Sequence, residues 1–343
     1  MFSGHGPATA FDAFLLLSFG GPESAADVEP YLDRVLRGRR LPPARRREIA
    51  AHYAYFGGKS PINDQNRALL SRLERALAAR HMSLPVYLGN RNWHPLILDT
   101  LNEMADAGVR HALALITSPF GSYSSCRQYL DEVEEARREI GPHAPRVSKL
   151  RTYFNHPRFV EAWCDRIQAA TAHWSPEQRR RAQVFFSVHS LPVKMPGCDL
   201  YVAQAKDLAA ILAARLSLSA EQWQLVYQSR SGPPQQPWLE PDVRTAIAEL
   251  GARRPGTDLL LVPMGFVSDH VEVLYDLDVD AYQVAAAADI RIVRVRTVGT
   301  HPAMVQMICE LIEERQRGDG QRPVLGVLGP APDECPADCC RAP

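Results

Sequence analysis

The sequence lacks a net charge, because 39 Lys and Arg residues balance 39 Asp and Glu residues over a length of 343. A protein that recruits nucleic acid through a general positive field needs an excess of basic residues, so we expect no nucleic-acid partner. Any anion recognition must come from a local cluster, and a dense basic one occupies residues 36–47.

Long apolar runs and a secretory signal are also missing. No window approaches the ~20 consecutive apolar residues that span a bilayer. The N-terminal segment MFSGHGPATA has no basic stretch followed by an apolar region, as a signal peptide would have. These features predict a cytoplasmic protein without a transmembrane segment.

The cysteine pattern contains no disulfide framework. Four of the seven cysteines are scattered along the chain, at positions 126, 164, 198 and 309. The other three, Cys335, Cys339 and Cys340, crowd into the C-terminal tail. In a reducing compartment, such a density is more typical of a metal site than of disulfides.

What is present is typical of a large folded enzyme, with 46% hydrophobic and 23% charged residues. The length predicts two lobes of about 150 residues each. Strand-length apolar runs alternate with amphipathic helical segments, which predicts an α/β fold of two similar doubly wound, Rossmann-like lobes with parallel sheets. The apolar runs are residues 12–19, 85–90, 111–118, 184–190, 224–229, 258–264 and 290–295.

The chain is expected to change lobe near residue 150, where a short basic strand leads into a helix that begins with proline. We therefore predict an N-terminal lobe over 11–150 and a C-terminal lobe over 151–300. A last helix, 301–318, is expected to pack back on the first lobe, and a cysteine-containing tail follows over 319–343. Open α/β sheets bind ligands beyond the carboxyl ends of their strands, so the chemistry should follow the strands.

Six blocks along the chain carry a family resemblance. They are LLLSFGGPES, YFGGKSPINDQN, GNRNWHP, FFSVHSLP, YQSRSGP with PWLEPDV, and GFVSDHVEVLYDLD. A single short motif occurs by chance, but six in order are specific. Together they resemble the ferrochelatases from Leu15 to about Arg315, and the N-terminal blocks look most like the actinobacterial type, which is taken to act on coproporphyrin III.

The resemblance implies a porphyrin cleft between the lobes and insertion of Fe²⁺ into the porphyrin. That reaction removes two pyrrole protons while a hydrated ion loses water, so it needs a base together with oxygen or nitrogen ligands. His189 and Glu272 match the catalytic blocks of the family and are expected to face each other across the insertion site, as catalytic groups and metal ligands. Taken alone, a histidine at a strand end is more often structural.

Further acidic residues accompany Glu272. Asp269 and His270 belong to the same block and are expected to orient Glu272. If the segment is helical, Asp276 and Asp280 share a face with Glu272. Like charges at this spacing cost about 0.2–0.5 kcal/mol per pair, which favours a proton exit or metal entry path over a stabilising role. A solvated acidic face remains the alternative for the two aspartates.

The carboxylates of a porphyrin need fixed donors. Arg37 can form a bidentate pair with a carboxylate, and the resemblance implies hydroxyl donors from Tyr53, Ser60, Ser122 and Tyr123. Phe19 stands where several bacterial relatives have tyrosine, so it can pack against the ring but cannot bind the metal. A basic stretch at 37–47 replaces the apolar lip of animal-type enzymes, which favours the water-soluble coproporphyrin III over protoporphyrin IX.

The tail cysteines match a feature of some ferrochelatases, a [2Fe–2S] cluster held by three tail cysteines and one from the start of the second lobe. The resemblance assigns these ligands to Cys335, Cys339, Cys340 and Cys164. Four thiolates satisfy the ligand count of the cluster. A redox-sensitive tail without a cluster is the alternative.

Three other functions are compatible with parts of this pattern. A protoporphyrin IX ferrochelatase differs only in substrate, and a chelatase for cobalt or nickel tends to carry a second histidine where Glu272 stands. A porphyrin or haem carrier would bind the ring without turnover. The expected partners are the porphyrin and ferrous iron, with a monomeric chain that contacts other haem-pathway enzymes transiently.

Overall fold

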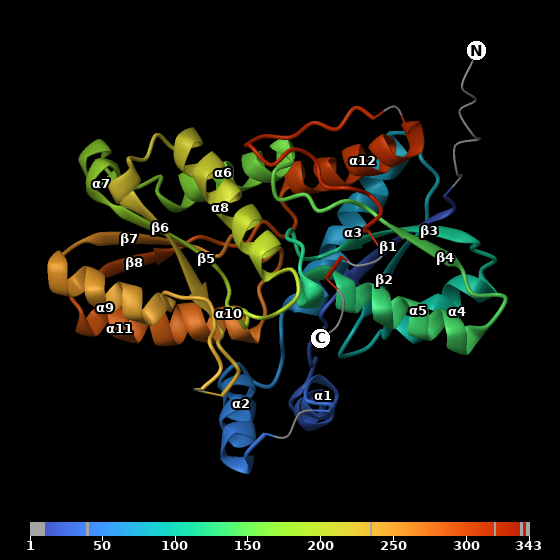
Figure 1. The fold of residues 1–343 in the computed structure, drawn as a ribbon, viewed down its shortest axis with the longest axis horizontal. Coiled ribbons are helices and arrows are strands. Elements are labelled where there is room, and N and C mark those ends of the chain that lie inside the picture. The colour runs from blue at the N-terminus through green and yellow to red at the C-terminus, as the bar shows by residue number, and fades with distance from the viewer. Residues whose placement is uncertain (1–10, 39–40, 234, 319, 337–338, 341–343) are drawn as a thin grey trace.

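The structure is a computed structural model that describes residues 11–38, 41–233, 235–318, 320–336 and 339–340. Two four-stranded sheets form its framework, in the orders β2-β1-β3-β4 and β6-β5-β7-β8 (Figure 1). The first sheet contains β1 (Ala13–Ser18), β2 (Val86–Asn90), β3 (His111–Ile116) and β4 (Arg146–Lys149). The second contains β5 (Gln183–His189), β6 (Trp223–Gln228), β7 (Asp258–Val262) and β8 (Arg291–Arg294).

All of the strand pairs are parallel, which confirms the predicted α/β class. Every residue of β1 and β3 is buried, as expected for central strands with helices on both faces. The edge strands β4 and β8 are more exposed and mix arginine with apolar residues. The apolar runs 12–19, 111–118, 184–190 and 258–264 therefore form the central strands, and the other three form edge strands.

The helices of the N-terminal part lie around the first sheet, apart from α1 and α2, which project below both sheets in Figure 1. They are α1 (Val28–Val35), α2 (Pro43–Tyr55), α3 (Ile62–Ala79), α4 (Ile97–Asp106) and α5 (Gln128–Ile140), with a 3₁₀ turn at Ala25–Asp27 and a π-helical turn at Tyr123–Arg127.

Of the remaining helices, all but the last lie around the second sheet (Figure 1). They are α6 (Pro157–Ala170), α7 (Pro176–Arg181), α8 (Cys198–Arg215), α9 (Val243–Arg253), α10 (Val271–Tyr275), α11 (Ala281–Ala287) and α12 (Pro302–Arg317), with a 3₁₀ turn at Ala220–Gln222 and a π-helical turn at Asp276–Asp280. The last helix, α12, lies against both α3 and α6. One apolar core joins the two halves, because it contains β1 and β3 residues, β5 and β7 residues, and the buried side of α12.

The two sheets have the same topology, since the first strand of each lies between the second and the third. The end of β1, at Ser18, therefore corresponds to the end of β5, at His189. A π-helical turn follows the third strand in each half, at Tyr123–Arg127 and at Asp276–Asp280. Such turns are frequent at functional sites.

Candidate active site

His189 is the last residue of β5 and lies where the parallel-sheet rule expects chemistry. Its Nδ1 is 2.5 Å from the carbonyl oxygen of Ser190, so in the neutral ring Nδ1 carries the proton and donates it to this oxygen. Nε2 is then the free acceptor, and it lies 3.6 Å from Oε2 of Glu272. The backbone of β5 thus presents to Glu272 the nitrogen that can accept a proton or bind a metal.

Glu272 is held by the start of α10. His270 caps this helix, because its Nδ1 accepts a hydrogen bond from the backbone N–H of Val273 at 3.2 Å. The other ring nitrogen of His270 lies 4.0 Å from the carboxylate of Glu272. Glu272 therefore has an imidazole on either side, from two different elements of the second half.

The contacts among His189, His270 and Glu272 change the pKa values of these side chains. Burial alone would raise the pKa of Glu272, but His189, His270 and His52 outweigh it and lower that pKa to about 2. Burial opposes the charging of His189, yet the contact with Glu272 and the Ser190 carbonyl raise the pKa of its imidazole. The pair holds a shared proton more tightly than an isolated histidine would.

Asp276 and Asp280 lie in the π-helical turn that follows Glu272. Asp276 accepts a hydrogen bond from the Ser229 hydroxyl, and burial, against this bond, raises the pKa of its carboxyl to about 7. Asp280 lies 3.6 Å from the guanidinium of Arg244. The two aspartates therefore differ, since burial favours the protonated form of the first and the second is paired with a cation.

The segment formed by α1 and α2 packs onto this site. Tyr31 and Tyr53 are buried against Val271, next to His270 and Glu272. The imidazole of His52 stacks on the ring of Tyr275, with 3.6 Å between ring centroids and 10° between planes. An element from the first half of the chain thus covers the helix that carries Glu272.

Comparison with known proteins identifies the family. A model of the ferrochelatase family matches residues 11–316. The chain belongs to the ferrochelatase family. It is 48% identical over 333 residues to a ferrochelatase of Rhodopirellula baltica, covering 96% of this chain and 93% of the relative. It is 46% identical over 318 residues to a coproporphyrin III ferrochelatase of Nocardia farcinica, covering 90% and 89%.

A solved chelatase structure has the same fold. The chain is similar to SirB from Bacillus subtilis with Fe³⁺, at a TM-score of 0.55 and 13% identity, covering 91% of this chain and 98% of SirB. At this identity the likeness supports the fold alone. Together with the family it makes the protein a metal chelatase with the predicted two-sheet architecture. None of the described helices is long and apolar enough to cross a membrane.

Two glycine-containing ferrochelatase blocks meet in the first half. A Cβ at Gly21 would lie 2.6 Å from Cβ of Ser60, and one at Gly58 would lie 2.3 Å from Cα of Ala25. Gly58 also has a φ of 80°, which L residues with side chains rarely adopt. The glycines of these blocks therefore allow the close backbone packing that anchors α1 and α2.

The residues expected to bind propionates have different environments. Arg37 is exposed at the end of α1, and Tyr123 is half-buried in the first π-helical turn. Ser60 is 2% exposed, and the buried Tyr53 hydroxyl donates to the hydroxyl of Tyr31 at 3.2 Å. Arg37 and Tyr123 are thus the members of this set that are accessible as the structure stands.

Ser122 and Phe19 have structural contacts of their own. The Ser122 side chain is fully buried and accepts a hydrogen bond from the backbone N–H of Ser125 at 3.1 Å, which caps the π-helical turn. Phe19 is half-buried beside the α1–α2 core, and the Arg91 guanidinium lies 5.9 Å from the centroid of its ring. The Ser122 hydroxyl also donates to the Ser125 hydroxyl at 2.8 Å, so both of its roles are taken by Ser125.

The structure groups the tail thiols with Cys126 and leaves Cys164 apart. Burial raises the pKa of Cys126 to about 11, and the neighbouring Cys335 and Cys339 add to the effect. The pKa of Cys164 is raised by burial and influenced by Arg215, Asp165 and Glu161, with no thiol among these groups. The tail thiols therefore lie nearer to Cys126, in the first π-helical turn, than to Cys164 on α6.

Cys340 connects the tail to both halves. It is 8% exposed, and a Cβ at Gly197 would lie 2.4 Å from its Sγ and 3.0 Å from Cα of Ser122. Its Sγ lies 3.7 Å from that of Cys339. Four cysteine thiols from two segments match the donor chemistry of a [2Fe–2S] cluster. Among the described residues, however, no group of three His, Cys, Asp or Glu side chains is already arranged around a metal ion.

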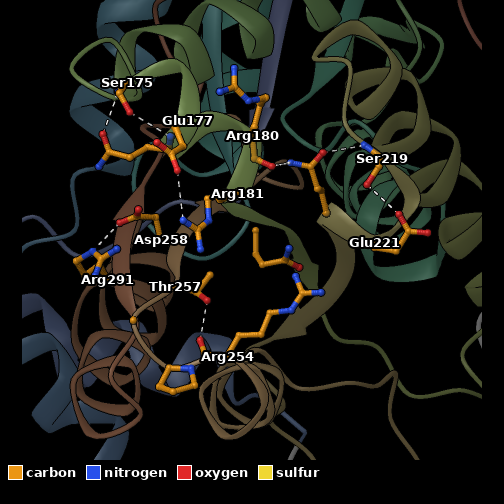
Figure 2. A pocket seen from close by; sticks show the side chains of 15 residues that line it. Ser175, Glu177, Arg180, Arg181, Ser219, Glu221, Arg254, Thr257, Asp258 and Arg291 are labelled. Atoms are coloured by element: carbon orange, nitrogen blue, oxygen red, sulfur yellow. Dashed lines mark hydrogen bonds and ion pairs between the residues drawn. The ribbon is translucent and has the colours of Figure 1, made fainter.

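A cavity of about 710 Å³ lies at the opposite ends of the strands, where β5, β7 and β8 begin. Figure 2 shows its arginine-rich lining, in which Arg181 pairs with Glu177 and Arg291 pairs with Asp258. Arg181 ends α7, and cations at helix C-termini balance the helix dipole. This hollow is therefore explained by the helix ends and lies away from His189.

Proposed function

We propose that this enzyme inserts Fe²⁺ into coproporphyrin III to give coprohaem, with the porphyrin lying between a lobe over 11–150 and a lobe over 151–300. The single observation that carries the proposal is the distance of 3.6 Å between Nε2 of His189 and Oε2 of Glu272. One group can accept a pyrrole proton, and both can ligate an incoming ion.

The protonation of the site supports this chemistry. The proton shared by His189 and Glu272 must leave before the imidazole can accept one from the porphyrin. Asp276, with a pKa raised to about 7 by burial, is the next group along the π-helical turn that can take it up. We therefore propose that His189 receives the two pyrrole protons one after the other and that Asp276 and Asp280 lead each of them outward, with Asp269 and His270 orienting Glu272.

The choice of porphyrin rests on charge. Coproporphyrin III carries four carboxylates, and an exposed Arg37 at the end of α1 can pair with one of them. Several relatives at 43–47% identity are named coproporphyrin III ferrochelatases, among them those of Frankia alni and Streptomyces coelicolor. Tyr123 supplies a second polar group in the same half, and Phe19 a flat apolar surface for the ring.

The test compares coproporphyrin III with protoporphyrin IX as substrates under anaerobic Fe²⁺. The absorption change on metallation measures the rate for each porphyrin. We expect coproporphyrin III to be the better substrate by kcat/KM. Arg37→Ala should raise KM for coproporphyrin III more than it lowers kcat, because it removes a contact made equally in the ground and transition states. Arg47→Ala, in an exposed stretch of α2, is the matched control.

Three outcomes would contradict the proposal. Equal kcat/KM for the two porphyrins would remove the substrate assignment, and an unchanged KM in Arg37→Ala would remove Arg37 as a carboxylate donor. Porphyrin binding without any metallation would favour a carrier. We also propose that the enzyme is a monomer and that it acts in the cytoplasm. Its seven free cysteines support the second of these points, because a reducing compartment keeps thiols free.

We further propose that Cys126, Cys335, Cys339 and Cys340 hold a [2Fe–2S] cluster. The mutual effects of these thiols on their pKa values support this set over one with Cys164. When bound, the cluster would supply a link between the tail and the first half of the chain. The four residues would provide the thiolates, and Lys149, which lowers the pKa of Cys335 against burial, would favour their charged form.

Cys126→Ser is expected to abolish the visible absorption and the acid-labile sulfide of freshly purified enzyme. Cys164→Ser, the matched control on α6, should retain both. A wild-type protein without acid-labile sulfide would contradict the cluster itself. If Cys164→Ser loses the visible absorption and the acid-labile sulfide while Cys126→Ser retains both, Cys164 is the fourth ligand.

A further inference from the structure

Arg294 is a buried cation at the end of β8 that the sequence analysis did not single out. Its side chain is 11% exposed, and it forms ion pairs with two aspartates. NH1 donates to Oδ1 of Asp269 at 2.9 Å, and Nε donates to Oδ1 of Asp278. One guanidinium therefore holds two carboxylates that are nine residues apart in sequence.

The two carboxylates lie on either side of Glu272. Asp269 immediately precedes His270, the residue that caps α10. Asp278 lies in the middle of the π-helical turn that contains Asp276. Arg294 thus ties both ends of the segment that carries the acidic groups to the edge strand of the second sheet.

The ion pairs between Arg294 and the two aspartates favour the charged forms of Arg294 and Asp278 against burial. Burial raises the pKa of Asp278, and Arg294 opposes this by hydrogen bonding and by charge. Burial works against a charged Arg294 too, but Asp269 and Asp278 raise its pKa overall. Removing the cation would leave two partly buried carboxylates unpaired, which is a strongly unfavourable arrangement.

The π-helical turn needs outside support. Such turns are rare and have poorer geometry than an α-helix, so tertiary contacts must favour them. Asp278 is the member of the turn that Arg294 holds, while Asp276 is held by Ser229 from the loop after β6. The two contacts fix the turn at points two residues apart and set the direction in which Asp276 points.

We propose that Arg294 is a positioning residue for metal insertion, which holds the segment 269–278 so that Glu272 stays against His189. The inference rests on the proposed function, because it assigns Arg294 a role in the geometry of that reaction. Arg294 is assigned no contact with the porphyrin or the metal. It acts through Asp269 and Asp278 on the carboxylates beside the reacting atoms.

The test compares Arg294→Lys with Arg291→Lys. Arg291 begins the same strand and pairs with Asp258 at 2.7 Å, but its side chain is 63% exposed and lies at the other end of β8. A lysine keeps the charge yet cannot bridge two carboxylates with a planar fork. The control therefore removes an arginine ion pair from the same strand without touching the acidic segment.

We expect Arg294→Lys to lower kcat/KM for Fe²⁺ by about 10- to 100-fold, since a misplacement near 1 Å has effects of this size. The acid limb of the pH profile should move to lower pH, because a displaced Glu272 no longer raises the pKa of His189. Arg291→Lys should match wild type in both measurements. Asp278→Asn serves as the second variant and should shift the acid limb in the same direction.

NMR measurement of the pKa of the His189 imidazole without substrate tests the positioning role of Arg294 separately from the proposed function. A lower pKa in folded Arg294→Lys supports the positioning role even if wild-type enzyme inserts no iron, an outcome that would overturn only the proposed function. If Arg294→Lys and Asp278→Asn both leave this pKa at the wild-type value, the positioning role is wrong. If Arg294→Lys does not fold, Asp278→Asn alone decides.

Discussion

His189→Ala is expected to lower the rate of iron insertion by about 10²- to 10⁴-fold, the range that a positioned acid–base group contributes. The variant loses the one ring nitrogen that the Ser190 carbonyl leaves free and that lies 3.6 Å from Glu272. Porphyrin binding should persist, because the residues proposed to hold the porphyrin carboxylates lie in the other half of the chain. Stopped-flow absorption under anaerobic Fe²⁺ measures the rate, and fluorescence titration measures binding.

The control for this variant is His173→Ala, an exposed histidine just after α6 in the same half of the chain. It should leave both the rate and the binding constant at their wild-type values. A His189→Ala rate within a few-fold of wild type would remove His189 from the mechanism. Loss of porphyrin binding together with the rate would instead assign His189 to substrate binding.

Glu272→Gln is expected to lower kcat/KM for Fe²⁺ by about 100-fold and to shift the pH profile, since it removes a carboxylate ligand and changes the pKa of its neighbour. In wild type, Glu272 raises the pKa of His189. A histidine that must be neutral to accept a proton becomes active only as the pH rises through its pKa. Without the carboxylate that pKa falls, so the acid limb should move to lower pH.

The matched control for Glu272→Gln is Glu249→Gln on the exposed side of α9. Steady-state rates between pH 5 and 9 with both variants measure the effect. An acid limb that stays in place in Glu272→Gln would show that another group sets the pH dependence. A kcat/KM equal to that of wild type would exclude Glu272 as a ligand of the metal.

Much of the framework could be predicted because it depends on local pattern. The apolar runs at 12–19, 111–118 and 258–264 became β1, β3 and β7, with ends that differ by at most two residues. Buried parallel strands must be apolar on both faces, so their composition alone distinguishes them from the amphipathic helices. The π-helical turns could not be predicted, because they differ from an α-helix by a single hydrogen-bond step.

The active site also contains residues that local motifs predict and one that they do not. His189 and Glu272 were found by the blocks that contain them, and the structure brings their side chains together. Arg294 was missed, because a lone arginine at the end of an edge strand has no distinguishing neighbours in the sequence. Arg294 could have been predicted from a basic edge strand together with two aspartates that lack an assigned partner, Asp269 and Asp278.

The α/β class, the parallel strands and the family follow from short-range apolar periodicity and from motifs within single segments, so they could be predicted without a structure. The folded molecule was needed to find the cysteine beside the tail thiols, the hydroxyl that caps a turn and the cation that holds the acidic segment. Burial and ion pairing depend on which groups meet in the folded chain, and these can be far apart in the sequence, as Cys126 and Cys335 are. No local pattern encodes such a meeting.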